Sequence, residues 1–267
     1  MYLDYWRFKQ FPFENISDPD FFYLSKTHEE ALTRLIYAAE RRKGGAMLTG
    51  EIGCGKTTLS RIYINQLSED KYDISLIINP KLDPTDFLQE VLYQFGIENL
   101  PNKKIECLRI LNDRMLENMK NSKETLLIVD EAQLINESTF EEIRLLLNFQ
   151  LNNRFLLTIV LLGQPELRQK VNNIEQLDQR IAIRYHLRPF DLEETFEYIN
   201  FRLQRAGNVT EYLFDHATIE KIYEYTNGVP RKINSLCDLA LLIGFSNRET
   251  VIDPETIEKI IKDGSFA

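Results

Sequence analysis

The sequence contains no long apolar run, and this absence excludes a membrane-spanning helix. In 267 residues the longest apolar run is FLLTIVLLG, which has the length of a strand, whereas a membrane span needs roughly 18 residues. The N-terminus, MYLDYWRFKQ, has acidic and aromatic residues where a signal peptide has a basic flank and an apolar stretch. We therefore expect a cytoplasmic protein.

Cysteine is also scarce, and positive charge is not in excess. The three cysteines, Cys54, Cys107 and Cys237, are odd in number and match neither metal-ligand nor redox-motif spacing. The net charge of −9 argues against a globally basic surface for nucleic acid, although it leaves a local patch open. Hydrophobic content of 43% is ordinary for a globular protein.

Three glycines lie within six positions of the stretch TGEIGCGKTTLS, and this clustering needs a backbone reason because glycine is costly in regular structure. The pattern is that of a phosphate-binding loop, which follows a buried strand and opens a helix. Both flanks fit, since GAMLTG is a short apolar run and the residues after the loop have helical spacing. The residues expected to bind a nucleotide here are Gly50, Glu51, Ile52, Gly53, Cys54, Gly55, Lys56, Thr57 and Thr58.

The chemistry of this loop follows from its geometry. Backbone N–H groups of residues without bulky side chains turn toward an anion, and the N-terminus of the following helix adds a partial positive charge. Lys56 is expected to reach the β- and γ-phosphates of ATP, and the Thr57 hydroxyl is expected to hold Mg²⁺. At Cys54 a small loop residue is a simpler interpretation than a redox switch.

Strands and helices alternate through the first 190 residues, which predicts an α/β fold with a parallel sheet covered on both faces. A capping box at Thr27 and Glu30 is expected to open a helix before the first strand. After IAIRYHL the sequence predicts helices only. We therefore place a domain boundary near residue 190, with a nucleotide-binding domain at 1–190 and an all-α domain at 191–267.

Residues of the second domain supply helix starts and stops. Asp191 with Glu194, and Asp253 before Pro254, are expected N-terminal caps. Two glycines, Gly207 and Gly228, are expected to end helices.

The stretch TLLIVDEAQ adds what hydrolysis requires beyond binding. Four apolar residues predict a buried strand that ends in Asp130 and Glu131, at the carboxyl edge where such sheets bind ligands. Asp130 is expected to hold Mg²⁺, directly or through water, and Glu131 to orient and deprotonate the attacking water. Two acids at a strand end can also form a solvated turn.

Three further polar residues are candidates for contact with phosphate. Gln164 ends the apolar strand of LLGQPELR, where it can sense the γ-phosphate or belong to an ordinary loop. Arg180 and Arg184 lie in QLDQRIAIRYHL, and Arg231 lies in GVPRKIN. A guanidinium suits phosphate because it is permanently charged and presents a planar fork of donors, although each arginine can equally be a surface charge.

The order GxxxxGKT, apolar strand plus DE, LLGQPELR, RIxxRYHL and GxPRxIN resembles that of the AAA+ ATPases. Longer segments of the sequence, including MYLDYWRFKQFPF, VDEAQ and GVPRKINSLCD, are similar to those of the ExeA/GspA group of general-secretion and pilus-biogenesis ATPases. The resemblance covers nearly the whole chain. It implies a P-loop αβα sandwich with a five-stranded sheet in the order 5-1-4-3-2 and a small helical lid.

The resemblance also implies roles. Gln164 takes the place of sensor 1, Arg231 that of a sensor 2 acting in cis, and Arg180, with Arg184 second, that of the finger that reaches a neighbouring subunit's ATP. Active sites at subunit interfaces imply an ATP-dependent homo-oligomer, a ring or a filament. The aromatic N-terminal stretch, with Phe13 and Tyr23, is expected near the adenine or as a hydrophobic brace.

Full-length ExeA-type proteins continue into a membrane span and a periplasmic peptidoglycan-binding region. The resemblance therefore implies either the cytoplasmic part of an inner-membrane protein or a short stand-alone member. In the first case the chain is expected to drive assembly of a secretin through an inner-membrane partner. The alternative is a DNA transposition regulator resembling TnsC or TniB, for which the short basic clusters ERRKG and NKK are the only local support.

Overall fold

The computed structural model describes residues 2–151, 154–207 and 213–264, and the chain forms two compact units. One, the sheet unit, contains residues 27–50 and 59–187. The other, the helical unit, contains residues 1–26, 51–58 and 188–267. The phosphate-loop segment 51–58 thus belongs with the helical unit, although its neighbours in the chain belong to the sheet unit.

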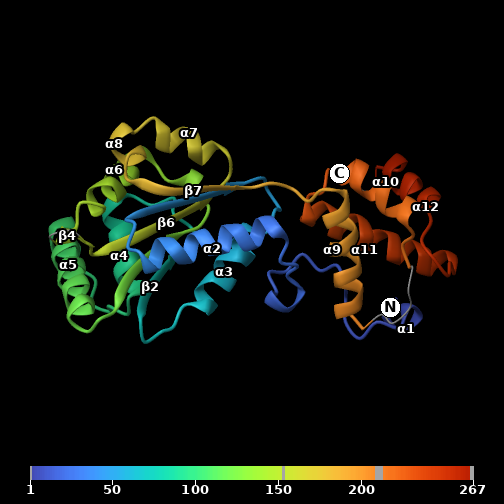
Figure 1. The fold of residues 1–267 in the computed structure, drawn as a ribbon, viewed down its shortest axis with the longest axis horizontal. Helices are drawn as coiled ribbons and strands as arrows, with labels where there is room; N and C mark the ends of the chain where they lie inside the picture. Colours follow the sequence, from blue (N-terminus) through green and yellow to red (C-terminus); the bar gives the residue numbers. More distant parts are fainter. Residues whose placement is uncertain (1, 152–153, 208–212, 265–267) are drawn as a thin grey trace. The chain divides into compact units, whose positions relative to one another are not determined.

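The sheet unit is built from alternating strands and helices (Figure 1). In chain order its elements are α2 (Lys26–Glu40), β1 (Gly45–Gly50), α3 (Lys56–Gln66), β2 (Tyr72–Ile77), α4 (Pro84–Gln94), α5 (Lys104–Lys120), β3 (Glu124–Val129), the 3-10 helix η2 (Ala132–Leu134), α6 (Glu137–Leu146), β4 (Gln150–Leu151), β5 (Arg154–Phe155), β6 (Leu157–Gly163), α7 (Glu166–Asn172), α8 (Glu175–Asp178) and β7 (Ile181–Leu187). The first residues of α2 and α3 belong to the helical unit.

Five strands form one parallel sheet in the order β2-β3-β6-β1-β7. Numbered along the chain without the short β4 and β5, this is the order 5-1-4-3-2, so the expected fold class is confirmed. The strands β4 and β5 form a separate antiparallel hairpin that the sequence analysis did not predict.

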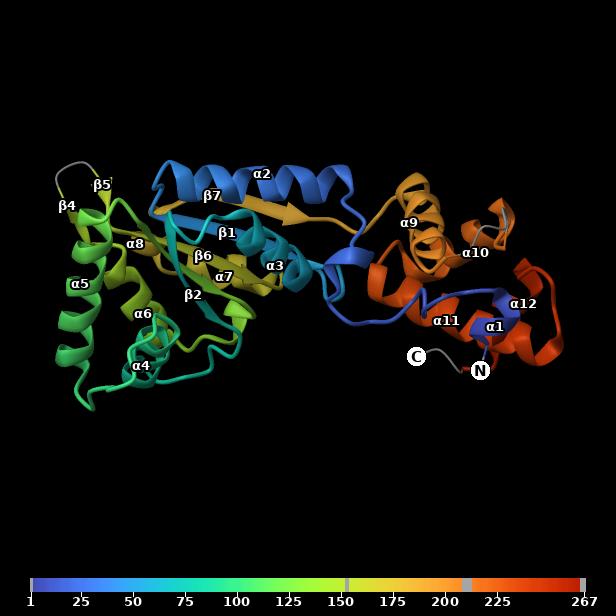
Figure 2. The same ribbon diagram turned by 90° about the horizontal axis from the view of Figure 1, so that it is seen from below.

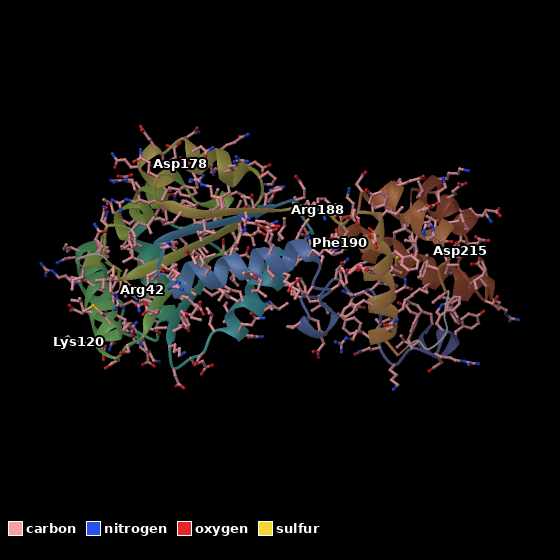
Figure 3. The ribbon with its side chains drawn as sticks, in the orientation of Figure 1. Arg42, Lys120, Asp178, Arg188, Phe190 and Asp215 are labelled. Atoms are coloured by element: carbon pink, nitrogen blue, oxygen red, sulfur yellow. The ribbon has the colours of Figure 1, made fainter. Side chains whose placement is uncertain are left out.

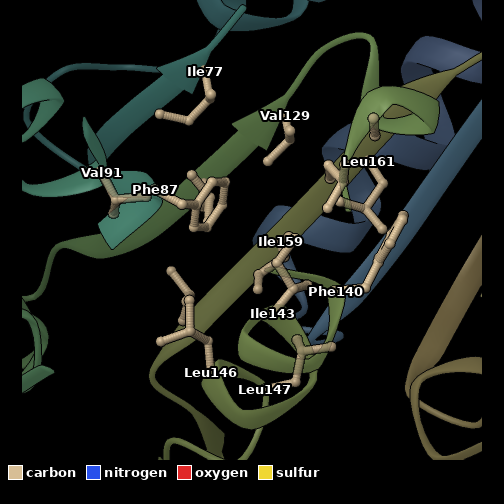
Figure 4. Packing of buried hydrophobic residues seen from close by; sticks show 14 of the residues in the cluster. Ile77, Phe87, Val91, Val129, Phe140, Ile143, Leu146, Leu147, Ile159 and Leu161 are labelled. Carbon is tan, nitrogen blue, oxygen red and sulfur yellow. The ribbon is translucent and has the colours of Figure 1, made fainter. Parts of the chain in front are cut away.

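Both faces of the sheet are covered because its inner strands are apolar along their length. Every residue of β1 and β6 is buried. Side chains alternate between the faces, so Leu127 and Val129 of β3 pack with α4, α5, α6 and α7, while Leu126 and Ile128 are buried against the other face. Figure 4 shows part of this core, with Val129 of β3, Phe87 of α4 and Phe140 of α6. Near that second face α2 lies along β7 (Figure 2), where the Tyr185 hydroxyl donates to Glu30 at 2.9 Å.

The helix α2 begins two residues earlier than the capping box at Thr27 and Glu30 predicts. It starts at Lys26, so Thr27 lies in its first turn and not at the N-cap position that the proposed capping box requires. Helix α6, in contrast, has a clear cap, because the Asn136 side chain accepts a hydrogen bond from the Thr139 N–H at 2.8 Å. The side chains of Asn136 and Thr139 also donate to the Leu82 carbonyl, at 2.9 and 2.7 Å. These bonds anchor the loop that follows β3.

The helical unit is built from short N-terminal elements and four longer helices. Its elements are α1 (Leu3–Trp6), the 3-10 helix η1 (Pro19–Phe21), α9 (Leu192–Arg205), α10 (His216–Thr226), α11 (Pro230–Asn247) and α12 (Pro254–Lys262). Within the described parts of the chain, no helix combines the length and apolar character that crossing a membrane requires.

Predicted helix boundaries in this unit are confirmed. Asp191 and Glu194 form a capping box, with each side chain accepting from the other's backbone N–H at 2.9 and 3.1 Å. Asp253 caps α12 by accepting from Thr256 N–H at 2.8 Å. Sequence analysis missed the cap of α10, where Asp215 accepts from Thr218 N–H at 2.7 Å (Figure 3).

The turn between α10 and α11 has room only for glycine. Gly228 has φ of +70°, and a Cβ atom there would lie 1.9 Å from the Phe190 carbonyl oxygen. The Phe190 N–H donates to the Gly228 carbonyl at 2.9 Å. This close approach ties the segment before α9 to the α10–α11 turn.

The N-terminal segment packs on the C-terminal helices, although the sequence assigned it to the domain 1–190. Its apolar side chains are buried in the core of the helical unit; they include Tyr2, Trp6, Phe8, Phe13 and Phe21. Phe13 packs edge-on against Phe214, and Tyr23 packs edge-on against Phe190 and Tyr198. These contacts are those of a hydrophobic brace.

Arg202 of α9 fixes the path of this segment. Its guanidinium is buried and donates to the backbone carbonyls of Pro12 and Glu14 at 2.6 and 2.9 Å. The same group lies over the ring of Phe21, 5.0 Å from its centroid. A buried charge is costly unless it is hydrogen-bonded, and here backbone carbonyls satisfy it.

Candidate active site

The phosphate loop joins the end of β1 to the start of α3. Gly53 and Gly55 both have φ of +85°, a conformation that side chains disfavour. Lys56 is the first residue of α3, and its Nζ donates to the Glu51 carbonyl at 2.9 Å. Thr57 follows as the second residue of the helix. The local structure is therefore the strand-loop-helix that the sequence predicted.

Within the helical unit, the loop touches the start of α11. A Cβ atom on Gly53 would lie 2.7 Å from the Arg231 Cβ, and the Arg231 N–H donates to the Gly53 carbonyl at 3.3 Å. The Arg231 side chain is exposed, and its guanidinium makes no hydrogen bond or ion pair within the described residues. Sequence analysis predicted Arg231 as a nucleotide contact but gave no sign of this backbone contact.

Cys54 is not an activated thiol in this structure. Its side chain is buried, and burial raises the pKa of the thiol to about 11, against a smaller opposing effect of Lys56. The thiol is therefore protonated at neutral pH. This favours the small-residue interpretation of Cys54 over a redox switch.

The two acids of TLLIVDEAQ follow β3 directly. Asp130 is 3% exposed, and its N–H donates to the Ile77 carbonyl at 2.8 Å, which continues the pairing with β2. Its Oδ1 accepts from the Glu131 N–H at 2.9 Å. Glu131 has φ of +50°, a left-handed conformation that costs a residue other than glycine roughly 1–2 kcal/mol. Strained backbone of this kind is concentrated at functional sites.

Gln133 connects Glu131 to Gln164, a link that the sequence analysis missed. The Gln133 Nε2 donates to Glu131 Oε2 at 2.5 Å, and its Oε1 accepts from the Gln164 N–H at 3.1 Å. Gln164 itself is half-buried and follows β6. In the sequence, this link is indicated only by Gln133 itself, the last residue of VDEAQ.

The two arginines of QLDQRIAIRYHL are both engaged inside the sheet unit. Arg180 donates to the Leu147 carbonyl at 2.9 Å. Arg184 forms an ion pair with Asp178 at 2.8 Å and also donates to the Asp178 carbonyl at 2.6 Å. The side chain of Arg184 therefore has the stronger intramolecular partners.

The predicted residues divide between the units. Asp130, Glu131, Gln164 and Arg180 belong to the sheet unit, and Lys56, Thr57 and Arg231 belong to the helical unit. Among the described residues no three acidic, histidine or cysteine side chains gather as a metal site. Mg²⁺ in nucleotide sites needs only one or two carboxylates beside phosphate and water oxygens, so the carboxylate of Asp130 and the hydroxyl of Thr57 fit the chemistry of this ion.

A family model described as an AAA domain matches residues 39–171. General secretion pathway protein A of Aeromonas hydrophila is 37% identical over 252 residues, which are 92% of this chain and 45% of that protein. An uncharacterized HTH-type transcriptional regulator of Methanocaldococcus jannaschii is 24% identical, over 82% of this chain and 61% of that protein. The chain thus spans about half the length of the curated relatives it matches.

Solved structures share the fold at low sequence identity. The ORC2 protein of Aeropyrum pernix, in ADPNP-ADP complexes, has a TM-score of 0.70 at 17% identity, over 96% of this chain and 72% of that one. Cdc6p of Pyrobaculum aerophilum has a TM-score of 0.67 at 18% identity, over 93% and 71%. The RuvB Holliday junction branch migration motor of Thermotoga maritima has a TM-score of 0.59 at 19% identity, over 95% and 73%.

Proposed function

Because this chain belongs to the AAA+ ATPases and is related to general secretion pathway protein A, we propose that it is a Mg²⁺-dependent ATPase whose nucleotide cycle drives assembly of its own oligomer. The reaction is hydrolysis of ATP to ADP and phosphate. The observation that supports it best is the parallel pairing of β1 with β6 and of β6 with β3. Gly50 ends β1, while Gln164 and Asp130 follow β6 and β3, so all three lie at the carboxyl edge of one sheet, where such folds bind ligands.

Each residue of the proposed site has a separate task. Backbone N–H groups of the phosphate loop and the ammonium of Lys56 neutralise phosphate charge, while Thr57 and Asp130 hold Mg²⁺. Glu131 accepts the proton of the attacking water as the new bond to the γ-phosphorus forms and the bond to ADP breaks. Gln164 and Arg231 are the proposed contacts of the γ-phosphate.

The first test removes the side chain of Lys56, which is expected to contact phosphate, and the proposed base Glu131 in separate variants. We expect Lys56→Ala to lose Mg²⁺-dependent ATP binding, and Glu131→Gln to keep binding while hydrolysis falls about 10²–10⁴-fold, because an amide cannot accept the proton. Binding of a fluorescent ATP analogue with and without EDTA, together with phosphate release, measures both effects. Lys120→Ala and Glu137→Gln, which change exposed residues of the same types, are the matched controls. Wild-type turnover by Glu131→Gln would show that Glu131 is not the base.

The proposed biological setting is secretion machinery at the cytoplasmic face of the inner membrane. The 37% identity to general secretion pathway protein A supports it, as does the net charge of −9. We propose that the oligomer acts on an inner-membrane partner and through it on secretin assembly.

DNA distinguishes this setting from that of a transposition regulator. Affinity for DNA comes mainly from neutralised phosphates, so it collapses between about 50 and 200 mM salt. We expect ATP turnover and sedimentation to be the same with and without duplex DNA at both salt concentrations. DNA stimulation that salt removes, together with filament formation, would replace the secretion setting with the TnsC/TniB-like one.

A further inference from the structure

Gln133 is a buried glutamine whose amide nitrogen and amide oxygen both form hydrogen bonds. Its side chain is 8% exposed, its Nε2 donates to Glu131 Oε2 at 2.5 Å, and its Oε1 accepts from the Gln164 N–H at 3.1 Å. The partners fix the orientation of the amide, because a carboxylate can only accept and a backbone N–H can only donate. A hydrogen bond to a charged acceptor is shorter and stronger than one between neutral groups.

The space around this amide is closely filled. A Cβ atom on Gly163 would lie 2.7 Å from Gln133 Oε1 and 2.8 Å from Leu167 Cδ2. Gly163 is therefore the residue that allows the amide of Gln133 to reach the backbone beyond β6.

A second connection joins the same loop to α7, the helix that follows Gln164. The Lys170 ammonium of α7 donates to the carbonyls of Gln133 and Ile135 at 2.6 and 3.2 Å. Helix α7 follows Gln164, so the middle residue of η2 and the residue after η2 are both hydrogen-bonded to the segment that follows β6. The loop that bears Glu131 is therefore connected to the segment that bears Gln164 by more than one hydrogen bond.

We propose that Gln133 is a positioning residue for hydrolysis, which holds the Glu131 carboxylate in one orientation and couples it to the backbone of Gln164. Glu131 is attached to a strained, left-handed residue, and its side chain has rotamer freedom that the amide of Gln133 removes. Any shift of Gln164 toward a bound phosphate is passed to the base through the same amide. The inference rests on the proposed ATPase function.

The test replaces the amide by a thioether of similar size. We expect Gln133→Met to lower kcat roughly 10–100-fold, with KM and the affinity for Mg²⁺-ATP within about twofold of wild type, because misplacement by about 1 Å costs on that order while binding contacts remain. Gln89→Met is the matched control, since Gln89 is a half-buried glutamine of the same unit whose Nε2 donates to the Pro101 carbonyl at 2.8 Å. Equal kcat values for the two variants would overturn the inference.

Combination with Glu131→Gln separates positioning from general loss of structure. If Gln133 acts through Glu131, adding Gln133→Met to Glu131→Gln should lower the single-turnover rate less than about threefold further. The effects of two coupled residues are not additive, so the second substitution has little left to remove. A further loss as large as in the wild-type background would show that Gln133 acts independently of Glu131.

A second variant answers the question if Gln133→Met fails to fold. Gln133→Glu keeps the size of the side chain and an acceptor for the Gln164 N–H, but it replaces the amide donor to Glu131 with a second carboxyl group, which repels the base or shares a proton with it. We expect kcat to fall at least as far as in Gln133→Met, whereas a purely structural tie to Gln164 would predict recovery to the wild-type rate. Absence of ATP turnover by the wild-type chain would instead contradict the proposed function itself.

Discussion

Gly53 meets two requirements that among the amino acids only glycine can meet. Its φ of +85° is costly for any residue with a side chain, and its missing Cβ leaves space for the Arg231 Cβ. Gly96 provides a comparison, because it has φ of +81° but nothing within 4 Å of an added Cβ. The two glycines therefore separate backbone strain from steric contact.

We expect Gly53→Ala to weaken ATP binding at least tenfold, because the added methyl group moves the phosphate loop or Arg231. Gly96→Ala should bind ATP as the wild type does and lose only about 1 kcal/mol of stability, the cost of a left-handed alanine. Equilibrium titration with a fluorescent ATP analogue and urea unfolding measure the two effects. Equal ATP affinity of both variants would mean that the contact between Gly53 and Arg231 has no part in binding.

At the scale of elements, the turn between α10 and α11 leaves no room for a side chain at Gly228. We expect Gly228→Ala to lower the free energy of unfolding by about 2–4 kcal/mol, because its Cβ would lie 1.9 Å from a backbone oxygen that only main-chain movement can displace. The single tryptophan, Trp6, is buried in this unit, so its fluorescence in a urea titration reports the loss.

Gly96→Ala, at nearly the same φ, is again the control. A Gly228→Ala midpoint no lower than that of Gly96→Ala would show that the Phe190 segment moves aside without cost.

The features that could be predicted from the sequence are those determined by residues close together in the chain. The capping box of Asp191 and Glu194 lies within four residues, and the buried strands are apolar throughout, so both were readable from the sequence. The link from Gln133 to Gln164 spans 31 residues, and that from Arg202 to Glu14 spans 188. Such contacts depend on the tertiary fold, and no local pattern indicates them.

At the scale of the whole molecule, we predict that ATP turnover rises with protein concentration because Arg180 completes a neighbouring subunit's site. Arg180 is a better candidate than Arg184 for reaching a neighbouring subunit. Arg180 would lose only its hydrogen bond to the Leu147 carbonyl, whereas Arg184 would lose its ion pair with Asp178. Arg180→Ala should lower kcat on the order of a thousandfold. Phosphate release measured across a concentration series tests this.

Mixing provides the complementary measurement. Arg180→Ala mixed with Glu131→Gln should regain partial activity, because the first variant keeps its base and borrows an arginine from the second. Arg184→Ala in the same mixtures is the comparison. No recovery at any ratio, with mixed oligomers shown by sedimentation, would favour Arg184 or an arginine that acts in cis.

The packing of the N-terminal segment also has a consequence for synthesis of the chain. Residues 2–26 leave the ribosome before their partners on α9 and α11, which begin at Leu192 and Pro230. At 5–20 residues per second, the aromatic side chains of this segment wait roughly 10–40 s for a surface to cover them. During that interval the nascent chain exposes Trp6, Phe8, Phe13 and Phe21, which makes it a substrate for chaperones that bind aromatic segments.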